Sequence, residues 1–291
     1  MLTEKWHHIK GDLGLVLVTL IWGTTFVITE VSLEQVPPLL YLAMRFMLAF
    51  GLLVLVFGKK LRAVGWQELK TGMIVGAILF AGFATQTIGM LDEDTTASKA
   101  AFITGLSVIL TPLLAMVFLK KKPNWATMVG AFLAFGGLAV LALNGEGGSL
   151  VSWGDLLILA CAVAFAGHII AVGKFTNTMD TGVLTTIQIG VAGLLCGIAG
   201  LVLEPIPAAV SREVWWGLVY MGLAATAGVL FLQTWAQKFT TPTRTAIIFT
   251  LEPVFAAFFA YWFLAEALTG RMIVGGVLIL AGILLAELKG E

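Results

Sequence analysis

Three ionisable side chains, Arg45, His168 and Glu252, lie inside long apolar stretches of the 291-residue chain. A charged group within such a stretch is costly unless it is paired or hydrated, so each of the three requires an explanation. A carboxylate and an imidazole can bind a cationic group or exchange a proton, which makes Glu252 and His168 candidate binding and coupling residues. For Glu252 the alternative is structural, because its carboxylate could satisfy backbone groups that Pro253 leaves without partners.

Arg45 allows two readings of its own. A structural role is favoured, in which the long side chain snorkels toward the outer face and pairs with Glu30 or Glu34. The alternative is a role in gating or coupling.

Two Gln-Thr pairs, Gln86-Thr87 and Gln233-Thr234, supply amides that can hydrogen-bond a polar solute without fixing a net charge. Interhelical hydrogen bonding explains them equally well. Trp22 lies in the middle of its apolar stretch, where its indole could stack on a planar solute or pack between helices.

Several kinds of chemistry are excluded by what the sequence lacks. Its histidines are His7, His8 and His168, and no HExxH, GxSxG or nucleotide-binding motif occurs. Cys161 and Cys196 both lie in apolar runs and indicate packing, not a metal site or a disulfide. We therefore expect no enzyme, no metal and no cofactor, and the zero net charge gives no reason to expect nucleic-acid binding.

The elements that must position these residues are membrane helices. Charged residues make up 12% of the chain and hydrophobic residues 59%, whereas a soluble domain carries about 25% charged residues. Apolar stretches of about 20 residues, the length of a membrane span, recur throughout. The sequence predicts an all-α integral membrane protein with ten spans, near residues 12–30, 39–57, 71–90, 99–119, 125–143, 155–173, 183–203, 214–236, 245–264 and 270–288.

The basic residues predict the orientation. If the N-terminus is cytoplasmic, 13 of the 17 Lys and Arg residues fall on inner segments, Lys99, Arg212 and Arg271 fall on outer segments, and Arg45 lies within a span. Cytoplasmic loops carry such an excess of positive charge. We expect a multi-pass protein of the inner (plasma) membrane with both termini in the cytoplasm.

The chain also contains an internal repeat. Residues 95–146 align without gaps on residues 240–291 with 15 of 52 positions identical, including Gly130 with Gly275 and Gly137 with Gly282. Five spans per half is an odd number, so the halves must enter the membrane from opposite sides, as in many secondary transporters. We expect a first five-helix repeat over residues 1–148 and a second, inverted one over residues 149–291.

The repeat relates polar residues of the two halves. It pairs Thr25 with His168, Arg45 with Gln188, and Ser107 with Glu252, which predicts a polar layer on each side of a midplane cavity. The predicted substrate-binding residues are Trp22, Thr25, Gln86, Ser107, His168, Gln233 and Glu252. The predicted gating or coupling residues are Arg45, His168, Gln188 and Glu252.

The sequence resembles the drug/metabolite transporter superfamily, specifically its ten-helix EamA-type branch, over essentially its whole length. The motifs that carry the resemblance are Trp22-Gly23 with Thr24-Thr25-Phe26, Pro37-Pro38, Arg45-Phe46, Thr111-Pro112, Leu251-Glu252-Pro253-Val254 and Leu264-Ala265-Glu266. The resemblance implies a central cavity lined mainly by spans 1, 3, 4, 6, 8 and 9. It also implies export or exchange of small metabolites such as amino acids, or of drugs. Lys120-Lys121 replaces the Gly-Glu pair that ends the fourth helix in many relatives, so no role of that pair transfers to this chain.

Together these features predict a secondary active transporter that exports small polar or amphipathic metabolites such as amino acids by alternating access. A multidrug or quaternary-cation exporter is the alternative, and an intramembrane enzyme or lipid-handling protein is a third hypothesis. The expected partners are a small-molecule substrate and the lipid bilayer, with the proton as a candidate coupling ion. Two GxxxG patterns, at residues 72–76 and 193–197, permit close helix approach and leave a monomer or a homodimer open.

Overall fold

The computed structural model describes residues 2–92, 95, 100, 103–120, 122–142, 152–252, 254–255, 258–259 and 270–289. Within these ranges the chain is almost entirely helical and forms no β-strand. The first half contains α1 (Leu2–Gly23), α2 (Thr25–Leu33), α3 (Pro38–Leu61), α4 (Trp66–Gly89), α6 (Ser107–Phe118) and α7 (Trp125–Ala142). The second half contains α8 (Trp153–Phe175), α9 (Thr181–Leu203), α10 (Arg212–Gly222), a π-helical turn η1 (Leu223–Gly228), α11 (Val229–Ala236), α12 (Pro242–Phe249) and α14 (Gly270–Lys289).

Five of the described helices are long and apolar enough to cross a membrane. They are Pro38–Leu61, Trp66–Gly89, Trp153–Phe175, Thr181–Leu203 and Arg212–Ala236, and shorter apolar helices span Ile103–Phe118, Trp125–Val140 and Ile273–Ala286. The chain is therefore a helical multi-pass membrane protein. The count of ten spans stays a prediction.

Two predicted spans differ from single regular helices. The span expected at 12–30 is broken at Thr24, because the hydroxyls of Thr24 and Thr25 donate to the carbonyls of Ile21 and Trp22, three residues back. Such local bonds compete with the helical ladder, and Gly23 is a weak helix former. The span expected at 214–236 contains the π-helical turn η1.

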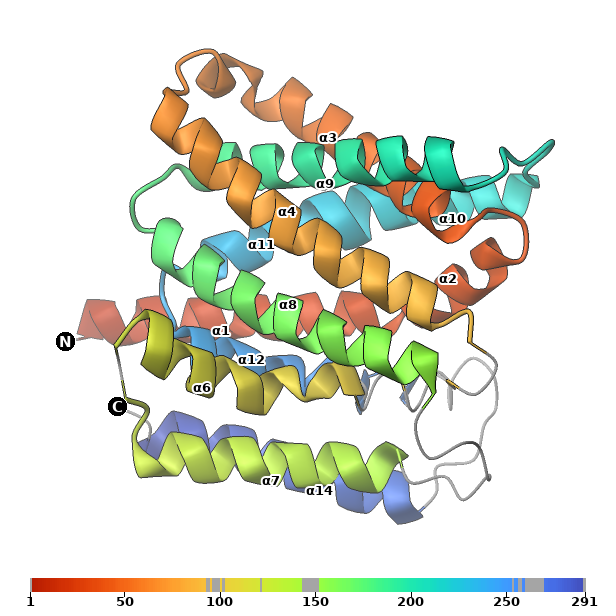
Figure 1. Ribbon diagram of the computed structural model, residues 1–291. Coiled ribbons are helices and arrows are strands. Elements are labelled where there is room, and N and C mark those ends of the chain that lie inside the picture. Colours follow the sequence, from red (N-terminus) through yellow and green to blue (C-terminus); the bar gives the residue numbers. More distant parts are fainter. Residues whose placement is uncertain are drawn as a thin grey trace.

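Helix packing relates the two halves to each other (Figure 1). α3 packs on α9 at one side of the bundle, and α7 packs on α14 at the other. The contact of α4 with α8 has its counterpart in the contact of α1 with α11, and that of α6 with α8 in that of α12 with α1. Exchanging the halves maps the α3–α9 and α7–α14 contacts onto themselves and each of the other contacts onto its counterpart, as a two-fold related repeat requires.

The glycines that the repeat aligns meet across this pseudo-symmetry. A Cβ atom on Gly130 would lie 2.5 Å from the carbonyl oxygen of Gly282, and one on Gly137 would lie 2.6 Å from that of Gly275. Residue 130 meets 282 while 137 meets 275, so α7 and α14 run antiparallel with their backbones nearly touching. Only glycine permits so close an approach.

The two GxxxG patterns also pack within the chain. Gly72 faces Ile187 of α9, Gly76 faces the backbone of Gln188, and Gly193 faces Met47 of α3. These glycines therefore serve internal helix contacts, and the choice between monomer and homodimer stays open.

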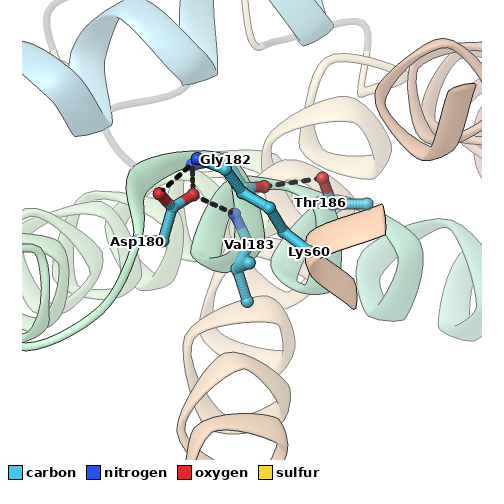
Figure 2. Close-up of polar contacts among 5 residues, drawn as sticks. All are labelled: Lys60, Asp180, Gly182, Val183 and Thr186. Atoms are coloured by element: carbon cyan, nitrogen blue, oxygen red, sulfur yellow. Dashed lines mark hydrogen bonds and ion pairs between the residues drawn. The ribbon is translucent and has the colours of Figure 1, made fainter. Parts of the chain in front are cut away.

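The start of α1 and the end of α14 lie at the same end of the bundle, beside the connections from α3 to α4 and from α8 to α9 (Figure 1). At this end Asp180 caps α9, accepting hydrogen bonds from the backbone N–H groups of Gly182 at 2.9 Å and Val183 at 3.2 Å. Lys60 of α3 donates to the same carboxylate at 2.7 Å (Figure 2). An ion pair thus joins α3 to α9.

Candidate functional site

A cavity lies between the two halves of the bundle. The volume open to the centres of water-sized molecules is about 120 Å³, and a single buried water needs about 10–15 Å³ on that measure. The cavity can therefore hold a small solute or several waters. Its walls come from α1, α2, α4, α6, α8, α11, α12 and the residues next to them, while α3 contributes Arg45.

The structure brings all seven predicted substrate-binding residues to the wall of this one cavity, namely Trp22, Thr25, Gln86, Ser107, His168, Gln233 and Glu252. Of the predicted gating or coupling residues, Gln188 alone is outside the lining and stands behind His168. Their roles in binding and gating stay predictions.

His168 and Gln188 form a buried link between α8 and α9. The imidazole Nε2 lies 2.7 Å from the side-chain oxygen of Gln188, whose amide nitrogen donates to the Thr234 hydroxyl at 3.3 Å. Thr234 in turn donates to the carbonyl of Leu230 at 2.7 Å. Three helices, α8, α9 and α11, are joined by this chain.

Gln233 begins a second chain beside the first. Its amide nitrogen donates to the side-chain oxygen of Gln237 at 3.3 Å, and the amide nitrogen of Gln237 donates to the carbonyl of Ile169 at 2.9 Å. Gln233 is only 1% exposed, as is Gln237. In the other half, Gln86 donates to the Thr104 hydroxyl at 3.3 Å. Both glutamines therefore line the cavity and also bond within the protein.

Arg45 does not snorkel as expected. Its side chain is 5% exposed, whereas Glu34 is exposed, and the side chain of Glu30 lies outside the described residues. The guanidinium donates to the hydroxyl of Thr226 and to the carbonyl of Ala225 at 3.3 Å, both in η1. Both acceptors are neutral and lie within the π-helical turn, and the pairing of Arg45 with Glu30 stays a prediction.

Trp22 combines the two roles that the sequence left open. It lines the cavity, and its indole N–H donates to the carbonyl of Ala225 at 3.1 Å. Its ring packs edge-on against Phe249 with centroids 5.3 Å apart.

Aromatic rings make up much of the remaining wall. Phe83 packs edge-on against Phe165 at 5.2 Å, and the guanidinium of Arg45 lies 5.1 Å from the Phe83 centroid. Sequence reasoning missed Phe83, Phe165 and Phe249, because nothing local separates them from the other members of a set of 19 phenylalanines.

Glu252 follows α12 and lines the cavity while being half-buried. Its carboxylate is within electrostatic range of Arg45. Its structural alternative depends on Pro253, which lies outside the described residues. In the part of the chain that the structure describes, no group of three His, Cys, Asp or Glu side chains could hold a metal ion.

Comparisons with known proteins agree over the whole chain. A family model described as the EamA-like transporter family matches residues 9–143 and again residues 152–288. An uncharacterized transporter of Archaeoglobus fulgidus is 32% identical over 286 residues, covering 98% of this chain and 88% of that protein. The uncharacterized transporter YoaV of Bacillus subtilis is 25% identical over 284 residues, covering 94% and 96% of the two chains. A solved structure described as "Crystal structure of protein" has a TM-score of 0.82 over 96% of this chain and 97% of that one, at 19% identity, which shows a shared fold.

Proposed function

We propose a transport mechanism on the premise that the chain belongs to the EamA-like transporter family. The chain is a membrane transporter and not an enzyme. We propose that it is a secondary active transporter that exports small polar or amphipathic metabolites, amino acids among them, across the inner membrane. Both termini face the cytoplasm in this proposal, since they share one end of the bundle with the basic connections at residues 59–62 and 174.

The observation that carries the proposal is the position of the cavity. It lies where the two halves meet and takes polar residues from both, such as Gln86 from the first half and Gln233 from the second. Two similar halves with equivalent contacts can exchange conformations, and the cavity then opens to alternate sides of the membrane. The two-fold pattern of helix contacts supports this mechanism.

Glu252 and His168 are the proposed coupling groups. Both line the cavity and both can carry a proton. His168 also bonds to Gln188 and so links the cavity wall to α9. A change of charge on the imidazole would therefore act on the binding site and on helix packing together.

The test is uptake by proteoliposomes under an imposed pH gradient, with a solute first identified in a thermal-shift screen of amino acids, polyamines, purines and cationic drugs. We expect His168→Ala and Glu252→Gln each to reduce gradient-driven uptake. His168→Gln separates the proton-carrying role of His168 from its hydrogen bond, because the new side chain can still donate to Gln188 but cannot titrate. Unchanged uptake in both test variants would make these residues structural, and indifference to the gradient would leave facilitated diffusion as the mechanism.

A second candidate is export of a multidrug or quaternary-cation type. Four aromatic side chains line the cavity together with a carboxylate, and aromatic faces attract cations. The same screen separates this candidate from amino acid export.

A further inference from the structure

The amide oxygen of Gln233 is a buried acceptor without a hydrogen-bond partner among the described residues. The residue lines the cavity and is 1% exposed. A buried acceptor that is left unsatisfied destabilises the fold, so such groups are rare and call for an explanation.

The orientation of this amide follows from its neighbours. The carbonyl of Ile169 can only accept, so the amide of Gln237 must turn its nitrogen toward it, at 2.9 Å. The oxygen of Gln237 then faces Gln233, which must present its own nitrogen at 3.3 Å. A flip of either amide would set two like groups against each other. The oxygen of Gln233 is therefore the atom that has no hydrogen-bond donor among the described residues.

The same reasoning applies to His168. Thr234 donates to the carbonyl of Leu230, so it accepts from the nitrogen of Gln188, and the oxygen of Gln188 faces the imidazole. His168 Nε2 therefore carries a hydrogen. In the neutral ring Nδ1 is then an acceptor as well.

Some donors on the wall already have acceptors within the protein. The indole N–H of Trp22 and one N–H of Arg45 both bond to the carbonyl of Ala225, and a second N–H of Arg45 bonds to Thr226. The amide of Gln86 donates to Thr104. Two acceptors of wall residues, the oxygen of Gln233 and the carboxylate of Glu252, have no hydrogen-bond donor among the described residues, and Glu252 lies within electrostatic range of Arg45.

We infer that the cavity recognises an organic amine through an N–H-bearing ammonium group, with the oxygen of Gln233 as the acceptor that selects for the N–H. Glu252 supplies the opposite charge, and Trp22 and Phe83 face the apolar part of the solute. The inference rests on the proposed function, because it takes this cavity to be the transport site. It favours primary, secondary and tertiary amines over quaternary ammonium ions, which have no N–H to donate.

Two probes of nearly equal size separate the N–H from the charge. N,N-dimethylphenethylammonium carries one N–H, whereas N,N,N-trimethylphenethylammonium carries none. We expect the purified full chain to bind the first on the order of tenfold more tightly, in thermal-shift and tryptophan-fluorescence titrations, since the second leaves the buried acceptor unpaired.

Three variants then locate the preference. Gln233→Leu should bind both probes alike, while Gln233→Glu, which keeps an acceptor, should retain the preference. Gln86→Leu is the matched control, because it removes a wall amide from the other half and leaves both Gln233 and Gln237 in place. We expect it to retain the preference. Should Gln233→Leu fail to fold, the binding of the two probes by the wild type and by Gln233→Glu still tests whether an acceptor at position 233 sets the preference.

Each other outcome overturns the inference. Equal binding of the two probes by the wild type, or a preference that survives in Gln233→Leu, removes the role of the Gln233 oxygen. Equal loss of preference in Gln86→Leu makes the effect of Gln233→Leu a general disturbance of the cavity. If the trimethyl probe binds more tightly, the transport proposal stands with quaternary cations as its solutes. If no solute of the wider screen binds or is transported either, the proposed function fails as well.

Discussion

Replacing Gly137 with alanine tests the contact on which the two-fold arrangement depends. The added Cβ would lie 2.6 Å from the carbonyl oxygen of Gly275, 2.8 Å from Cγ1 of Ile279 and 2.9 Å from its backbone nitrogen. Two of these atoms belong to the backbone of α14, so the helices themselves must separate. Overpacking of this kind costs about 1–3 kcal/mol.

Gly136, the preceding residue, is the matched control. A Cβ atom there meets nothing within 4 Å. Alanine at that position should stabilise the helix by about 0.5–1 kcal/mol, because glycine loses more conformational freedom on folding. Gly137→Ala gains the same helical term but carries the overpacking cost, so we expect it to be about 1–3 kcal/mol less stable than Gly136→Ala.

The assay is thermal unfolding of the two purified variants in the same detergent. The difference corresponds to a shift of several degrees in melting temperature, with Gly137→Ala the lower. Gly130→Ala should behave like Gly137→Ala, since its Cβ would lie 2.5 Å from the carbonyl of Gly282. Equal melting temperatures for Gly136→Ala and Gly137→Ala would show that α7 and α14 do not meet at their backbones. The α7–α14 contact would then no longer support a two-fold relation between the halves.

Two further predictions concern ion pairs at the end of the bundle that holds the termini. Asp12→Asn should lower stability by about 1–3 kcal/mol in thermal unfolding, since the Asp12–Arg244 contact of 2.7 Å is largely buried. The double variant with Arg244→Met should recover part of this loss. If the effects of the two single substitutions simply add in the double variant, the two residues are not coupled. Burial alone would raise the pKa of Asp180, but the hydrogen bond from Lys60 and those from the backbone hold it below its ordinary value. The carboxylate therefore stabilises the fold above about pH 4 and ceases to do so as the pH falls through the lowered pKa. Because both side chains are about half exposed, we expect Asp180→Asn to cost about 1 kcal/mol or less at pH 7 and progressively less as the pH falls below about 4. A loss that does not change with pH would contradict this assignment.

Much of the fold could be read from the sequence because its signals are local or repeated. Apolar stretches follow from the cost of exposing polar backbone to lipid, and the paired glycines follow from the close approach that they permit. Six of the seven residues predicted to bind substrate are polar side chains in apolar segments, and such residues face the interior, where they and Trp22 reach one cavity. The two glycine pairs of the repeat, Gly130 with Gly275 and Gly137 with Gly282, supply all four glycines that meet at the α7–α14 contact.

What could not be predicted depends on distant partners. Arg45 bonds to Thr226, 181 residues away, in a π-helical turn that no local pattern announced. Gln237 lies one residue beyond the predicted span, yet it fixes the orientation of Gln233. Both are consequences of tertiary packing, which a single sequence does not specify at the level of one side chain.

The repeat also explains where specificity has to reside. Alternating access requires that the two halves be similar in backbone, and the matched helix contacts meet that need. Discrimination between solutes requires the opposite, because groups repeated on both sides would bind the two ends of a solute alike. The glutamines of the two Gln-Thr pairs differ accordingly: Gln86 bonds to a threonine hydroxyl, whereas Gln233 bonds to Gln237 and its oxygen has no partner among the described residues. If this difference sets selectivity, substitutions of Gln233 should change the ratio of affinities for the two amine probes, while Gln86→Leu should change both affinities and leave their ratio near that of the wild type.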